Sequence, residues 1–166
     1  MSAPDKPQFS EARLAEIDAL AARYPSRKSA LMPVLYMAQQ DFGYLSMDTQ
    51  KMVAEVLGLR LMEVREVVTF YTMFKEQPTG KYLLEVCTNA SCMVNGADAL
   101  YAHMKNTLGI EPGQITEDGL FSINEVECAG ACAGAPVVQV NNMYHEKATA
   151  TDMDALISRI RAGEVI

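Results

Sequence analysis

The sequence predicts a mixed α/β fold in which a helical first half is followed by a second half built around a β-sheet. Apolar residues recur at helical spacing in the first half. Pro, Thr and Gly at 78–80 then interrupt this pattern. Beyond them, short runs of strand type alternate with helical stretches. We therefore expect an N-terminal helical domain over residues 1–77, flexible over residues 1–9, and a second domain over residues 78–166.

Four short helices are expected in the first domain. The first is capped by Ser10, and the second spans about residues 30–41 and stops at Gly43. The third starts after Ser46 and ends at Gly58, and a fourth follows it. The expected apolar faces of the four helices are Leu14, Ile17, Leu20 and Ala21; Leu31, Val34, Leu35 and Ala38; Met52, Val53, Val56 and Leu57; and Val64, Val67, Val68 and Tyr71. Helices of this length with short connections indicate a small bundle.

The second domain is expected to open with a strand, a helix and a second strand. Apolar residues favour a strand over residues 81–87 and a helix over about residues 97–108. Residues 121–127 form the next candidate strand, in which the apolar residue Val126 is out of phase with those before it. This phase change predicts a bulge or a twist before Cys128.

The rest of the second domain is predicted to form a hairpin and a closing helix. Residues 137–140 and 143–146 are strand candidates joined by two asparagines, which tolerate tight turns. A last helix is expected over about residues 152–161, with Thr151 as its cap. The order strand, helix, strand, strand, strand, helix fits a sheet with helices packed on it, of thioredoxin-like outline.

Four cysteines, the only ones in the chain, form two close pairs. Cys87 and Cys92 lie in CTNASC, and Cys128 and Cys132 lie in CAGAC. Each pair directly follows a predicted strand, so two neighbouring strands would bring the four sulfurs to one end of the sheet. Four thiolates are what a [2Fe-2S] cluster requires, two for each iron. Small residues at 129–131 would let backbone N–H groups approach the sulfurs. The first hypothesis is an electron carrier.

Other uses of four cysteines have to be weighed against this hypothesis. Four thiolates also make a closed zinc site, usually from pairs with two to four residues between them. A zinc-stabilised interaction module without redox chemistry therefore stays open. Disulfides need an oxidising compartment. We expect no secretory signal at the N-terminus and no membrane span, because no basic-then-apolar leader and no run of about 18 apolar residues is visible. A reduced, cytoplasmic setting follows.

Charge and motif content argue against two further functions. The chain has 14 basic and 21 acidic side chains and a net charge of −7, so nucleic acid is a poor partner. No Gly-x-Gly-x-x-Gly stretch follows any predicted strand. Nucleotide chemistry is therefore expected on another protein.

The chain resembles the small [2Fe-2S] subunit of NADH:quinone oxidoreductase, respiratory complex I (the E or 24 kDa type), over about residues 20–163. The resemblance is carried, in order and spacing, by YPSRKSALMPVLYMAQQDFGYLS, EVREVVTFYTMF, GKYLLEVCTNASCMVNGADAL and DGLFSINEVECAGACAGAPVVQVN. It implies a small helical bundle joined to a thioredoxin-like [2Fe-2S] ferredoxin domain. It also implies that Cys87, Cys92, Cys128 and Cys132 are the cluster ligands and that the chain has no catalytic residue of its own.

The same resemblance implies a partner and a location. The family acts as a subunit of an oxidoreductase and exchanges electrons with the flavin of a larger subunit, so FMN and NADH are expected on that partner. The complex implies a cytoplasmic position, peripheral to the inner membrane, with membrane association only through the complex. The equivalent diaphorase subunits of NAD-reducing hydrogenases and NAD-dependent formate dehydrogenases are the alternative.

Overall fold

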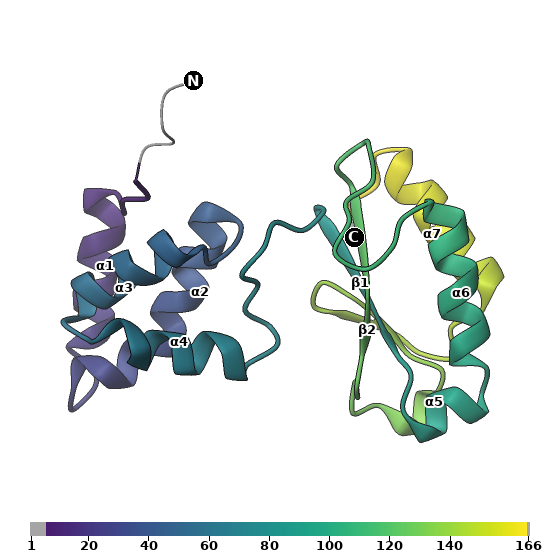
Figure 1. Ribbon diagram of the computed structural model, residues 1–166, viewed down its shortest axis with the longest axis horizontal. Helices are drawn as coiled ribbons and strands as arrows, with labels where there is room; N and C mark the ends of the chain where they lie inside the picture. The colour runs from purple at the N-terminus through teal and green to yellow at the C-terminus, as the bar shows by residue number, and fades with distance from the viewer. Residues whose placement is uncertain (1–5, 166) are drawn as a thin grey trace. The chain divides into compact units, whose positions relative to one another are not determined.

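The computed structural model describes residues 6–165 and divides the chain into two compact units, residues 1–78 and 79–166 (Figure 1). Each unit has its own hydrophobic core. Of the stretch expected to be flexible, residues 1–5 lie outside the described residues. Phe9 is buried, with its ring centroid 5.7 Å from that of Phe42, and it belongs to the core of the first unit.

The first unit contains the four expected helices. Their bounds are α1 Glu11–Ala21, α2 Leu31–Phe42, α3 Met47–Leu57 and α4 Leu61–Phe70, and a short 3-10 turn, Arg27–Ala30, precedes α2. Ser10 and Ser46 cap α1 and α3 as predicted, each accepting a backbone N–H of the first turn. Gly58 ends α3 in the left-handed conformation, with φ of 69°. The prediction that Tyr71 belongs to the apolar face of α4 is wrong, because Tyr71 follows the end of the helix and is 37% exposed.

Glu63, at the start of α4, is expected to make stability depend on pH in acid. Lys28 Nζ donates to Glu63 at 2.7 Å and the backbone N–H of Arg60 donates at 3.1 Å. These bonds lower the pKa of Glu63 from 4.5 to about 2. The stabilisation is therefore present above pH 4.5 and lost as the pH falls toward about 2. Glu63→Gln should flatten the decline in urea midpoint between about pH 5 and about pH 3, whereas Glu66→Gln should not. Equal declines in wild type and Glu63→Gln would contradict this.

The second unit is a four-stranded sheet with helices. Its elements are β1 Tyr82–Cys87, α5 Ala90–Val94, α6 Ala97–Leu108, β2 Phe121–Val126, a 3-10 turn Cys132–Gly134, β3 Val138–Val140, β4 Met143–His145 and α7 Ala150–Arg161. The strand order is β2-β1-β3-β4, with β1 and β2 parallel and the other pairs antiparallel. Helices α6 and α7 lie side by side on one face of the sheet (Figure 1). The predicted hairpin across residues 141–142 is confirmed.

Of the two features predicted for the second strand, a bulge or a twist, the bulge is absent from β2. The pairing of β2 with β1 runs without interruption from Phe121 opposite Tyr82 to Val126 opposite Cys87. Val126 is out of phase because it lies on the other face of the sheet, where it packs with Cys87 and Cys92. Apolar side chains are therefore needed on both faces at this end of β2, which breaks the simple alternation.

The cap of α7 also differs from the prediction. The hydroxyl of Thr149 accepts the N–H of Asp152 at 3.2 Å, and the Asp152 carboxylate accepts the N–H of Thr149 at 3.3 Å. Thr149 is thus the cap in a reciprocal capping box, and Thr151 lies within the first turn. Both threonines are followed three residues later by an aspartate, so the residue pattern alone could not decide between them.

This capping box gives a direct test of the correction. Thr149→Ala should destabilise the second unit by about 1 kcal/mol, because it leaves first-turn N–H groups without their partner. Thr151→Ala should change stability by less than about 0.5 kcal/mol. Urea unfolding followed by circular dichroism measures both. The assignment fails if Thr151→Ala proves the more damaging change.

No helix within residues 6–165 combines the length and the apolar character needed to cross a bilayer.

Candidate metal centre

The topology of β1 and β2 brings the two cysteine pairs to one end of the sheet. These strands are parallel neighbours, so their carboxyl ends lie at the same edge. Cys87 is the last residue of β1, and Cys128 follows the end of β2 by two residues. Cys92 lies on α5, and Cys132 opens the 3-10 turn. The expectation that the two cysteine pairs follow neighbouring strands at one edge of the sheet is confirmed.

The four thiols are close enough to influence one another. The thiols of Cys92 and Cys128 contribute to lowering the pKa of Cys87, and the charge of Cys132 contributes to raising the pKa of Cys92. All four are free thiols; Cys87 and Cys92 are buried, whereas Cys128 and Cys132 are exposed. Among the described residues, no three His, Cys, Asp or Glu side chains are placed around a point where one metal ion could sit.

Backbone N–H groups favour the thiolate form of Cys87. Burial opposes ionisation, but the N–H groups of Ala129 and Asn89, together with the thiols of Cys92 and Cys128, outweigh it and lower the pKa of Cys87. The Ala129 donor comes from the second cysteine loop. The expectation that small residues let N–H groups approach the sulfurs is therefore met.

The surroundings of Cys92 instead disfavour its thiolate form. Burial, followed by the neighbouring Cys87 thiol, raises the pKa of Cys92, although a hydrogen bond from the N–H of Val137 acts the other way. Val137 belongs to an apolar cluster with both buried cysteines and Ala97. The inner half of the site is thus dry, while its outer half, at Cys128 and Cys132, faces solvent.

Asn89 is a site residue that sequence analysis missed. Its side-chain oxygen accepts the N–H of Ala90 at 2.8 Å and caps α5, the helix that carries Cys92. Its Nδ2 donates to the carbonyl oxygen of Glu127, directly before Cys128, at 2.7 Å. Asn89 therefore ties the first cysteine loop to the second. The only signal was an N-cap residue type, and a helix of five residues is too short to show periodicity.

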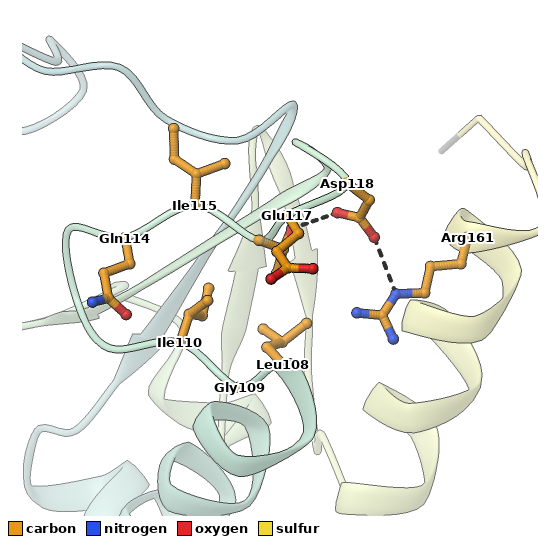
Figure 2. A pocket seen from close by; sticks show the side chains of 9 residues that line it. Leu108, Gly109, Ile110, Gln114, Ile115, Glu117, Asp118 and Arg161 are labelled. Atoms are coloured by element: carbon orange, nitrogen blue, oxygen red, sulfur yellow. Dashed lines mark hydrogen bonds and ion pairs between the residues drawn. The ribbon is translucent and has the colours of Figure 1, made fainter.

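A separate pocket lies at the other end of the sheet. It has a volume of about 730 Å³ and is lined by residues between α6 and β2 together with Arg161 (Figure 2). Asp118 accepts from the Thr116 hydroxyl at 2.5 Å and pairs with Arg161 at 3.4 Å. The Thr116 bond, the Leu120 N–H and Arg161 lower the pKa of Asp118. Of the charged side chains that line this pocket, Asp118 and Arg161 thus form an ion pair with each other.

The donor set at the cysteine end fits an iron–sulfur cluster. Two short loops each supply two thiols, backbone N–H groups point at the sulfurs, and apolar residues surround the buried pair. Together with a sheet covered on one face by two helices, this site defines a class of protein: single-cluster iron–sulfur modules built on a thioredoxin-like sheet.

Comparison with known proteins gives the family within this class. The model of the thioredoxin-like [2Fe-2S] ferredoxin family matches residues 17–161, and the chain belongs to this family. The predicted fold class and the predicted [2Fe-2S] cofactor are thereby confirmed.

Curated relatives and a solved structure are similar over most of the chain. The E 2 subunit of the NADH-quinone oxidoreductase of Rhizobium meliloti is 47% identical, over 90% of this chain and 89% of the relative. NADH-quinone oxidoreductase subunit 2 of Thermus thermophilus is 42% identical, over 86% of this chain and 81% of the relative. The crystal structure of an NAD+-reducing [NiFe]-hydrogenase in the H2-reduced state superposes with a TM-score of 0.70 and 25% identity, over 82% of this chain. This chain spans only 23% of that hydrogenase chain.

Proposed function

We propose that this chain is the electron-transfer subunit of the NADH-oxidising module of an NADH:quinone oxidoreductase. In this proposal Cys87, Cys92, Cys128 and Cys132 hold one [2Fe-2S] cluster. The observation that carries it is the parallel pairing of β1 with β2, because this pairing brings both cysteine pairs to one edge of the sheet. The identities of 47% and 42% to curated subunits of such complexes support the choice of complex.

The residues of this chain would bind the cluster, stabilise its charge and limit water access. When bound, a [2Fe-2S] cluster supplies one-electron exchange. N–H groups of residues 89, 129 and 137 face cysteine sulfurs and would offset negative charge on the ligands. The apolar cluster keeps Cys87 and Cys92 dry, and the exposed Cys128–Cys132 loop leaves a short path to a partner's redox centre.

The proposed partner is a larger subunit that binds FMN and NADH. This chain has no glycine-rich nucleotide fingerprint after its strands, so hydride chemistry is assigned to that partner. Membership of the complex would give a cytoplasmic position, peripheral to the inner membrane. The second candidate is a diaphorase subunit of an NAD-reducing hydrogenase, which the TM-score of 0.70 favours. The curated relatives give the first candidate more support because their identities are higher.

Metal analysis and co-purification test this proposal. Anaerobically purified protein should contain about two irons and two acid-labile sulfides per chain, and dithionite should give the electron paramagnetic resonance signal of a reduced [2Fe-2S] cluster. One zinc per chain with no sulfide would establish the zinc-stabilised module instead. Purification from native membranes should recover a flavin-bearing subunit and the quinone-reducing arm. A hydrogenase or molybdenum subunit in their place would point to the diaphorase alternative.

A further inference from the structure

A tyrosine outside the cysteine set contacts the second cysteine loop. Tyr144, in the middle of β4, donates its hydroxyl hydrogen to the carbonyl oxygen of Ala129 at 2.8 Å. The same peptide group carries the N–H of Gly130, which donates to Cys128 Sγ at 3.3 Å. A single peptide unit therefore links the Tyr144 phenol to the sulfur of Cys128.

The segment after β4 holds the same loop at two further points. The N–H of Lys147 donates to the Gly134 carbonyl oxygen at 2.6 Å, and the N–H of Ala148 donates to that of Pro136 at 3.0 Å. Lys147 has a φ of 50°, a left-handed backbone conformation that residues other than glycine rarely adopt. Such a conformation persists where the surroundings enforce it, often beside functional sites. The hairpin and this turn thus frame residues 129–136.

Core packing does not account for Tyr144. Its side chain is 50% exposed, and it is absent from the hydrophobic clusters of the second unit. Its specific contact is the hydrogen bond to Ala129, made across 15 positions of the sequence.

We propose that Tyr144 is a positioning residue that fixes and polarises the Ala129–Gly130 peptide and thereby raises the reduction potential of the cluster. The inference rests on the proposed function, with Cys128 as a ligand. A hydrogen bond accepted by a carbonyl oxygen polarises the peptide and strengthens its N–H as a donor. A stronger donor to a ligand sulfur favours the reduced state, which carries one more negative charge. Loss of the phenol hydroxyl should therefore make the potential more negative.

The test compares Tyr144→Phe with Tyr101→Phe in the full-length protein with its cluster bound. Tyr101 lies on α6 and packs against the core of the second unit. Tyr144→Phe should shift the redox equilibrium toward the oxidised form by about threefold, which is about 28 mV at 59 mV per tenfold change. Hydrogen–deuterium exchange followed by mass spectrometry should be faster in the peptide that covers residues 128–135. Tyr101→Phe should change neither quantity.

The outcomes separate this inference from the proposed function. A Tyr144→Phe protein with a full complement of iron and an unchanged potential overturns the inference and leaves the proposed function intact. Unchanged exchange over residues 128–135 overturns it equally, since the phenol would then not hold the loop. Wild-type protein without iron and sulfide overturns the proposed function and this inference together.

Discussion

Cys87→Ala is expected to abolish cluster binding. Cys87 is buried at the end of β1, and the thiols of Cys92 and Cys128 help to lower its pKa. Loss of this thiolate would leave one iron with an open position in a dry, apolar pocket where neither water nor a buffer thiol can easily replace it. Iron and sulfide should fall from about two per chain to near zero, and the visible absorbance and the resonance signal of the reduced protein should disappear.

The exposed cysteines should tolerate replacement better than Cys87. Cys132 faces solvent at the start of its 3-10 turn, so an added small thiol can reach the vacated position in Cys132→Ala. We expect this variant to lose most of its cluster and to recover part of it when reconstituted with excess thiol. Cys87→Ala should show no such recovery. Iron, sulfide and visible absorbance after reconstitution measure the difference.

A matched control separates ligation from damage to the loop. Ser91 precedes Cys92 on α5 and is exposed, so Ser91→Ala should keep full iron and sulfide. Iron content in Cys87→Ala equal to that in Ser91→Ala would show that Cys87 is not a ligand. Circular dichroism of both variants establishes that the fold is intact.

Local signals made the helical half of the fold predictable. Ser10 and Ser46 cap helices through bonds to residues three positions away, and Gly58 ends one through its own dihedral angles. Information of this kind is contained in a few consecutive residues. Thr149 and Thr151 offered the same local signal, an aspartate three residues later, and the structure places the cap at Thr149.

The cysteine site was predictable from its ligand residues, and its supporting contacts were not. Each pair follows a strand, so the four thiols could be brought together by assuming neighbouring strands. The donors that face the sulfurs are backbone N–H groups, and any residue other than proline can supply one. Asn89 and Tyr144 donate hydrogen bonds to backbone carbonyl oxygens at or next to the second cysteine loop, and both are distant from that loop in the sequence. No residue pattern indicates such contacts.

Gly80→Ala is expected to destabilise the second unit strongly, because Gly80 lies directly against the backbone of β2. A Cβ at this position would lie 2.5 Å from the carbonyl carbon of Phe121 and 2.8 Å from its Cα. Backbone atoms of a paired strand cannot turn aside as a flexible side chain can. The Gly80 N–H also donates to Ser122 Oγ at 2.8 Å, so relief of the clash would break a buried hydrogen bond. Overpacking and the lost bond together predict about 2–4 kcal/mol.

Gly80→Ala should lower the free energy of unfolding and should leave the cluster bound to the folded protein. Gly80 precedes the amino end of β1, whereas Cys87 is at its carboxyl end, and the six residue pairs from Tyr82 to Cys87 hold β1 against β2. The variant should therefore keep its iron at low temperature and lose its visible absorbance at a lower temperature and urea concentration than wild type. Lys81→Ala, at an exposed neighbouring position, should change stability by less than about 1 kcal/mol. A Gly80→Ala transition that coincides with that of Lys81→Ala would show that β2 can move away from the added methyl group at little cost.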